Sequence, residues 1–332
     1  MGSPPLPTSW KIPLLKNLPI CNIKGELYDT NGLFICRYKP LKSLGAGTFG
    51  HVDAFERKSA NGKSTIIALK RPKFPEMKLL NEAIFQRRLH NDLIDYGLSG
   101  CVPQVYDIFR YQPTDDIWFT MEAFEPLLVS QWCIKTLVLP EKRNYMILLL
   151  LQIALIIEVF EIELKIDHRD LKINNMIVVD EPANINIQWK GINKSISFPF
   201  RIVFVDFGFA CKGEEIDIKD FTHIPPLSAC PREGRNIFQV LVSLWNIQSL
   251  RNSLENTWGQ WIRERISKVL PKTPCVSLIE NAVGLDWMYT LVENKEFQAP
   301  LCAPNKIIRD CMNMLEGVDA AAGAAADFII TL

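Results

Sequence analysis

The eight residues from His168 to Asn175 constrain this chain more than any other stretch. They read H-R-D-L-K-I-N-N, with a long apolar run before them at residues 145–162 and a short β-branched run after them at residues 176–179. The first run predicts a buried helix and the second predicts a strand. In a tight loop between such elements, an Asp, a Lys two positions on and an Asn three further on can converge on one phosphoryl group. The octet therefore predicts a loop that handles phosphate.

Three further stretches accompany the octet in a fixed order. They are G-x-G-x-x-G-x-V at Gly45, Gly47, Gly50 and Val52, I-A-L-K ending at Lys70, and D-F-G beginning at Asp206. A glycine triplet alone is weak evidence, but the four stretches together resemble the signature of the eukaryotic-type protein kinase superfamily, of the serine/threonine type. The resemblance extends over residues 33–210 and fades beyond them, where the activation segment and the C-terminal lobe diverge.

The resemblance implies an α+β, two-lobed protein kinase-like fold. A small antiparallel β-sheet with one main helix would form the N-lobe, and a larger, mainly helical C-lobe would follow. The expected divisions are a loosely ordered Pro-rich extension at residues 1–32, the N-lobe at 33–122, the C-lobe at 123–318 and a tail at 319–332. Asn61-Gly62 predicts a tight hairpin in the N-lobe. Two alternating stretches near residues 181–200 predict an inserted β-hairpin in the C-lobe.

The resemblance also implies a role for each motif residue. Asp170 would accept the proton of the attacking hydroxyl, and Lys172 would neutralise charge on the transferred γ-phosphoryl group. Asn175 and Asp206 would hold one or two Mg²⁺ ions. Lys70 would bind the α- and β-phosphates of ATP and needs a carboxylate partner. Glu82, in a helical stretch 12 positions on, is the best candidate, with Glu76 as the alternative.

The nucleotide pocket is implied in the same way. The backbone N–H groups of the glycine stretch would approach the phosphates of ATP, because no side chain stands in the way. Met121 would be the gatekeeper, and the backbone from Glu122 to Phe124 would meet the adenine. Val52 and Ala68 on one side and Ile177 on the other would enclose the purine ring. An ordinary hairpin at Gly45, Gly47 and Gly50 is the competing interpretation.

The residue two positions after the Asp of the octet bears on the acceptor. A Lys there resembles kinases that phosphorylate Ser or Thr rather than Tyr, so the expected partner is a protein substrate with such a hydroxyl. His168 is interpreted as a structural core residue that contacts Phe207. Arg169 raises the possibility of control by a phosphate on Thr222 or Ser228.

The region after D-F-G departs from the family pattern. Glu233 stands where the glutamate of A-P-E is expected, and Asn236 stands where a helix Asp is expected. Two other interpretations stay open. A pseudokinase that binds nucleotide as a scaffold is favoured by Asn236 and by the polar Gln86 one turn after Glu82, and a small-molecule phosphotransferase is disfavoured by Lys172 and D-F-G.

Composition excludes several other classes. Lys+Arg and Asp+Glu are both 37, without long runs of like charge, so no nucleic acid partner is expected. Nine cysteines without a C-x-x-C pair indicate reduced, buried thiols and an intracellular, cytoplasmic setting. The apolar run at residues 146–157 is too short to span a bilayer, so no membrane is expected. The sequence leaves the oligomeric state open.

Overall fold

The computed structural model describes residues 15–47, 50–74, 79–125, 127–137, 145–189, 192–213, 216–217, 231–248, 258–271, 297–316 and 328–329. The chain divides into two compact units, Met1–Pro126 and Leu127–Leu332. The sequence analysis placed this division after residue 122, and the structure has it after Pro126.

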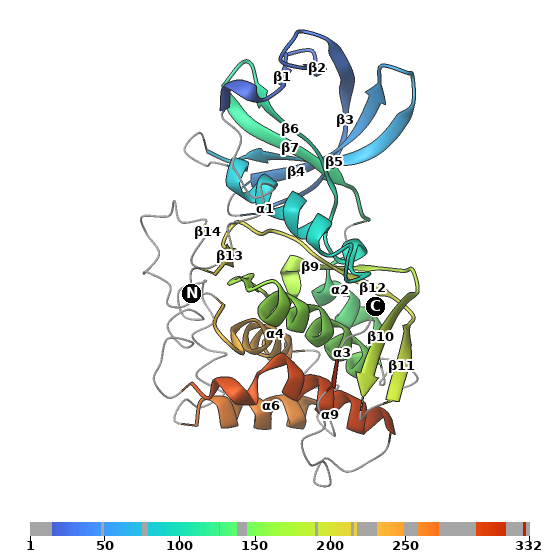
Figure 1. Ribbon diagram of the computed structural model, residues 1–332, viewed down its shortest axis with the longest axis vertical. Helices are drawn as coiled ribbons and strands as arrows, with labels where there is room; N and C mark the ends of the chain where they lie inside the picture. The colour runs from blue at the N-terminus through green and yellow to red at the C-terminus, as the bar shows by residue number, and fades with distance from the viewer. Residues whose placement is uncertain are drawn as a thin grey trace, which may run out of the picture. The chain divides into compact units, whose positions relative to one another are not determined.

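A closed barrel of seven strands forms the first unit, with neighbours in the order β1-β2-β3-β4-β5-β7-β6 (Figure 1, blue to green). Every neighbouring pair is antiparallel except β1 and β6, which are parallel. The strands are β1 (Ile20–Cys21), β2 (Glu26–Tyr28), β3 (Phe34–Ala46), β4 (Gly50–Ser59), β5 (Ser64–Pro72), β6 (Val105–Tyr111) and β7 (Asp116–Glu122). Among the described residues, three helical segments accompany them: η2 (Leu15–Asn17), α1 (Leu79–Asp92) and η3 (Ser99–Cys101).

The barrel corrects the expected fold class. A small antiparallel sheet beginning near residue 33 was expected, and residues 1–32 were expected to be a loosely ordered extension. Instead, β1 and β2 come from that extension, and β1 closes the sheet by pairing with β6, Ile20 opposite Arg110. The proline-rich run ends at Pro19, so the residues that follow keep the N–H donors that strands need. The protein kinase-like fold class is not borne out. Residues 1–14 lie outside the described part of the chain.

Side-chain alternation along the strands produces the two apolar clusters of this unit. Cys36 and Tyr38 on β3 are both buried and belong to one cluster, in which the Tyr38 ring stacks on Phe109 with centroids 5.5 Å apart. The other cluster joins Ala68 of β5 and Met121 of β7 to the buried face of α1. The barrel sheet therefore supports α1, which positions Glu82.

The hairpin predicted at Asn61-Gly62 is confirmed. Strands β4 and β5 are antiparallel across it, with Lys58 opposite Ser64. Gly62 has φ 84°, a left-handed conformation that glycine adopts without steric cost.

The second unit combines helices with three small sheets among its described residues. The helical segments are α2 (Val129–Thr136), α3 (Tyr145–Glu158), the π-helix η5 (Val159–Glu163), η6 (Ile173–Asn175), α4 (Arg235–Trp245), α6 (Trp258–Val269), η7 (Ala299–Leu301) and α9 (Pro304–Glu316). The strands are β8 (Ile166–Asp167), β9 (Met176–Val179), β10 (Ala183–Trp189), β11 (Ile192–Phe198), β12 (Arg201–Phe204), β13 (Cys211–Lys212), β14 (Ile216–Asp217) and β15 (Phe328–Ile329). Their sheets have the orders β11-β10-β15, β12-β9 and β14-β13-β8.

The apolar helix of this unit matches the buried helix predicted at residues 145–162. Together α3 and η5 run over Tyr145–Glu163, 19 residues, which is long and apolar enough to cross a membrane by length and composition. Of its most apolar window, 78% is buried inside the structure. Buried core helices of this kind pass the same test, and the burial agrees with the core helix expected there.

The predicted insert is confirmed as a β-hairpin. β10 and β11 pair antiparallel from Ala183 opposite Phe198 to Trp189 opposite Ile192. The tail contributes a third strand, because β15 pairs with β10 through Phe328 and Ile329. A two-residue strand has no periodicity that a sequence pattern could detect.

Cysteine chemistry agrees with the prediction at six positions and differs at one. The free and buried thiols are those of Cys21, Cys36, Cys101, Cys133, Cys302 and Cys311. Cys211 is disulfide-bonded.

Candidate active site

The octet forms a loop that runs from β8 to η6 in the second unit. Asp167 ends β8, residues 168–172 form the turn, and Ile173–Asn175 is one 3-10 turn that leads directly into β9. Arg169 has φ 64°, the left-handed region that L-residues seldom adopt. Such a backbone persists only where surrounding contacts hold it, and it is frequent at functional sites.

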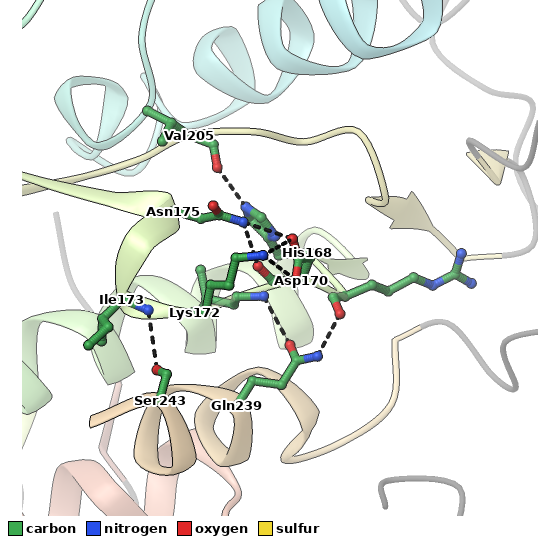
Figure 2. Close-up of polar contacts among 10 residues, drawn as sticks. His168, Asp170, Lys172, Ile173, Asn175, Val205, Gln239 and Ser243 are labelled. Atoms are coloured by element: carbon green, nitrogen blue, oxygen red, sulfur yellow. Dashed lines mark hydrogen bonds and ion pairs between the residues drawn. The ribbon is translucent and has the colours of Figure 1, made fainter. Parts of the chain in front are cut away.

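Two predicted residues of the octet, Lys172 and Asn175, converge on the Asp170 carboxylate (Figure 2). Lys172 Nζ lies 3.2 Å from Oδ1 and 3.0 Å from Oδ2. Asn175 Nδ2 donates to Asp170 Oδ2 at 3.0 Å and to the Asp170 carbonyl at 2.8 Å. The Asp170 side chain is 2% exposed and that of Lys172 is 28% exposed. The carboxylate is therefore buried, while the ammonium keeps access to solvent.

Burial raises the pKa of Asp170 from 3.8 to about 6. The Lys172 ammonium and the Asn175 hydrogen bond oppose that rise, and the negative charge of Asp206 adds to it. A carboxylate with a pKa near the working pH is suited to accept a proton, because it is ionised at neutral pH and still basic.

Asn175 and Asp206 offer oxygen ligands of the kind that Mg²⁺ prefers. Both hydrogen bonds from Asn175 to Asp170 use Nδ2, so neither occupies its Oδ1. Asp206 lies near enough to influence the charge of Asp170 and has φ 66°. Among the described residues there is no group of three or more His, Cys, Asp or Glu side chains that could hold a metal. The donor set fits Mg²⁺ bound mainly through substrate phosphates and water, with few protein ligands.

His168 has the structural role that the sequence predicted. Its ring is fully buried and lies against Phe207, with ring centroids 4.9 Å apart. Nε2 lies 3.1 Å from the carbonyl oxygen of Val205. Burial lowers the pKa of His168, so the neutral ring is favoured. It connects the octet to the backbone just before Asp206.

Helix α4 contributes contacts to the loop that sequence reasoning missed. Gln239 accepts from the Leu171 N–H at 3.0 Å and donates to the Arg169 carbonyl at 2.6 Å. One turn further on, Ser243 Oγ accepts from the Ile173 N–H at 3.2 Å. Gln239 and Ser243 are polar residues four apart on a buried apolar helix, a signal that would have found them.

Asn236, which stands where a helix Asp was expected, contacts the π-helix η5. Its Nδ2 donates to Glu161 Oε1 of the π-helix at 2.9 Å. At the start of the octet, the buried pair of Arg235 and Asp167 connects α4 to β8, with Nη1 and Oδ2 3.1 Å apart. Asp167 Oδ1 also accepts from the Arg169 N–H at 2.9 Å.

Two other predictions concern the region after D-F-G. Burial raises the pKa of Glu158 to about 7, and the negative charges of Glu163 and, more weakly, Glu233 add to that rise. Thr222 and Ser228, the candidate phosphorylation sites, lie outside the described residues. Control through Arg169 therefore stays a prediction.

In the first unit, Lys70 and Glu82 form the predicted ion pair. Lys70 Nζ lies 2.6 Å from Glu82 Oε1, and the two side chains are 6% and 3% exposed. The alternative partner, Glu76, lies outside the described residues. α1 begins at Leu79, so Glu82 stands in its first turn and faces β5.

The glycine stretch connects β3 to β4. The Gly47 N–H donates to the Gly50 carbonyl at 2.9 Å and closes the turn. A Cβ on Gly50 would lie 2.6 Å from the Arg71 carbonyl oxygen, so any side chain there would force the backbone to move. A Cβ on Gly45 would meet nothing within 4 Å. The turn thus keeps open space beside Gly45.

The predicted adenine-binding residues are only partly brought together. Val52, Ala68 and Met121 pack in one apolar cluster of the barrel. Ile177 belongs to β9 of the second unit. The Glu122 N–H donates to the Gln104 carbonyl at 2.8 Å, so this donor is already used within the barrel. Gln86, which the sequence singled out as polar, donates to Met121 Sδ at 3.4 Å.

No family model matches the chain, and no curated protein matches it. Membership of the protein kinase superfamily, expected from the four motifs, is not borne out: the small antiparallel sheet that it implied is a closed seven-stranded barrel.

Proposed function

We propose that this protein is an ATP-dependent phosphotransferase that moves the γ-phosphate of Mg·ATP to a Ser or Thr hydroxyl of a protein. The observation that carries the proposal is the buried Asp170 carboxylate between Lys172 and Asn175, with a pKa raised to about 6. Phosphoryl transfer asks a protein mainly for positioning and charge compensation. A base, a cation and oxygen ligands within one short loop supply these.

Asp170 would orient the attacking hydroxyl and accept its proton. Such a base contributes about 10²–10⁴-fold to a rate. Lys172, whose side chain is 28% exposed, would balance charge on the transferred group. Asn175 and Asp206 would hold Mg²⁺, which when bound neutralises phosphate charge. The Lys70 ammonium, held by Glu82, would bind the phosphates of ATP.

The experiment is transfer of labelled γ-phosphate from Mg·ATP to the protein itself and to a generic basic protein. Asp170→Asn keeps the shape of the side chain and removes its basicity, so label should fall by about 10²-fold or more. Chelation of Mg²⁺ should abolish transfer. Asp115→Asn, at a side chain that is 73% exposed in the barrel unit, is the control and should transfer as wild type does.

Absence of label with wild-type protein, despite measured ATP binding, would contradict the proposal. That outcome would favour a nucleotide-binding scaffold without turnover. Transfer to a sugar or an amine instead of a protein would point to a small-molecule phosphotransferase.

A further inference from the structure

The side-chain amide of Gln239 contacts both peptide groups that flank Asp170. Its Nε2 donates to the Arg169 carbonyl at 2.6 Å, and its Oε1 accepts from the Leu171 N–H at 3.0 Å. Gln239 is fully buried, so water does not compete for these bonds. Figure 2 shows the side chain reaching from α4 to the loop. The backbone on either side of the candidate base is therefore held by one amide.

Ser243 repeats this contact one turn along the helix. Its Oγ accepts from the Ile173 N–H at 3.2 Å and donates to the Val240 carbonyl at 2.9 Å. Residues four apart on a helix lie on one face, about 6 Å apart along the axis. Two residues of extended chain span a similar length, about 6.6 Å. α4 thus meets alternate residues of the loop, Leu171 and then Ile173.

The loop needs such support because its backbone is strained. Arg169 has φ 64°, and an L-residue keeps such a conformation only when its surroundings hold it. Asp167 holds the Arg169 N–H at 2.9 Å, and Gln239 holds the Arg169 carbonyl. The backbone N–H and the backbone carbonyl of the strained residue are thus both bonded to buried side chains.

We propose that Gln239 is a positioning residue for phosphoryl transfer, which sets the direction of the Asp170 carboxylate by holding the backbone on both sides of it. The inference rests on the proposed function. It requires an amide in particular, because the contact donates one hydrogen bond and accepts another. An ionised glutamate accepts only, and a methionine of similar length does neither.

A second buried glutamine provides a matched control within the same unit. Gln152 on α3 is 1% exposed, donates to the Phe200 carbonyl at 3.1 Å and accepts from the Ile202 N–H at 2.5 Å. Its contacts have the same form as those of Gln239, but they hold the start of β12. Substitution of Gln152 should therefore cost similar stability without touching the octet.

The experiment compares Gln239→Met and Gln239→Glu with Gln152→Met in the full chain. Each variant is measured for kcat and KM with Mg·ATP and a Ser/Thr protein substrate, for thermal stability, and for hydrogen exchange of the peptide that covers residues 167–175. We expect both Gln239 variants to lower kcat by about tenfold to a hundredfold, since small misplacements of a reacting group have effects of that size. KM for ATP should stay within about twofold, and exchange in the loop should rise. Gln152→Met should change neither kcat nor exchange in the loop.

Ser243→Ala is the milder variant, which keeps the test valid if the Gln239 variants fail to fold. Removing one acceptor for the Ile173 N–H should lower kcat by about fivefold. If Gln239→Met and Ser243→Ala both keep wild-type kcat, the inference is overturned while the proposed function stands. The inference is also overturned if Gln152→Met lowers kcat as much as Gln239→Met. If wild type transfers no label, both fail together.

Discussion

Replacing Asp170 by Asn should stabilise the protein while removing its activity. Burial raises the pKa of Asp170 from 3.8 to about 6, so the folded state disfavours the ionised carboxylate. The folded state therefore binds the proton more tightly than the unfolded chain, and stability falls as the pH rises from about 4 to 6. Asn keeps the shape of the neutral acid, but it does not titrate, so it adds no dependence of stability on pH. The stabilising effect should appear at neutral pH and fade in acid.

The magnitude follows from the shift in pKa. A difference of about two units corresponds to about 3 kcal/mol at pH 7, and by the same linkage relation to about half of that at pH 5. The side chain is 2% exposed, so solvent screening discounts little of this value. One kcal/mol moves the melting temperature by about 2–4 °C for a unit of this size. The Asn variant should thus melt several degrees higher at pH 7.

The assay is urea denaturation of wild type and Asp170→Asn at pH 5 and pH 7. The dependence of the free energy of unfolding on urea concentration, the slope m, is compared between the two proteins. The difference in free energy of unfolding should be positive and larger at pH 7. Asp115→Asn, whose side chain is 73% exposed, is the control and should differ from wild type by less than about 0.5 kcal/mol. A variant that is less stable than wild type at pH 7, or a difference that does not change with pH, would refute the reasoning.

Other parts of the structure make three further predictions. Lys70→Met should abolish transfer and destabilise the protein by about 3–5 kcal/mol, because Glu82 then stays buried without its cation. The double variant Lys70→Met with Glu82→Leu should recover the melting temperature but not the activity. Full activity of either variant would contradict the role given to Lys70 in ATP binding. The activity of wild type should rise with pH through about 6 as Asp170 loses its proton. In Lys172→Met this rise should occur at higher pH, since the Lys172 ammonium lowers the pKa of Asp170. If pH–rate measurements show the rise at the same pH in both proteins, another group titrates. Six thiols should resist alkylation in the native protein, because all are buried and burial raises the pKa of Cys21, for example, to about 12. Mass spectrometry of labelled peptides should show their modification only after denaturation. Rapid labelling of Cys133 or Cys302 in the native protein would contradict the packing. Those thiols are Cys21, Cys36, Cys101, Cys133, Cys302 and Cys311.

Local sequence patterns predicted the contacts whose two partners both stand at recognisable positions. Lys70 and Glu82 were paired correctly because one ends a strand motif and the other lies in the first turn of the next helix. The convergence of Lys172 and Asn175 on Asp170 was predictable because all three lie within six residues of one loop. In such cases chain connectivity limits the possible distances.

Contacts that depend on the packing of distant elements were missed. β1 is two residues long, too short for any periodicity, yet it closes the barrel against β6. Asn236 was singled out because it stands where a helix Asp was expected, whereas Gln239, which contacts the loop, was not singled out. The backbone from Glu122 to Phe124 was similarly assigned to adenine, because the sequence does not reveal that the Glu122 N–H is bonded to the Gln104 carbonyl.

The measurement that tests the central claim most directly is the identity of the phosphorylated group. Labelled Mg·ATP is offered together with a Ser/Thr peptide library, a Tyr peptide library, and a set of sugars and amines, and the products are separated after reaction with wild type and Asp170→Asn. The account predicts label on Ser or Thr with wild type and a loss of about 10²-fold or more with the variant. Label on small molecules, or equal label with both proteins, would contradict it.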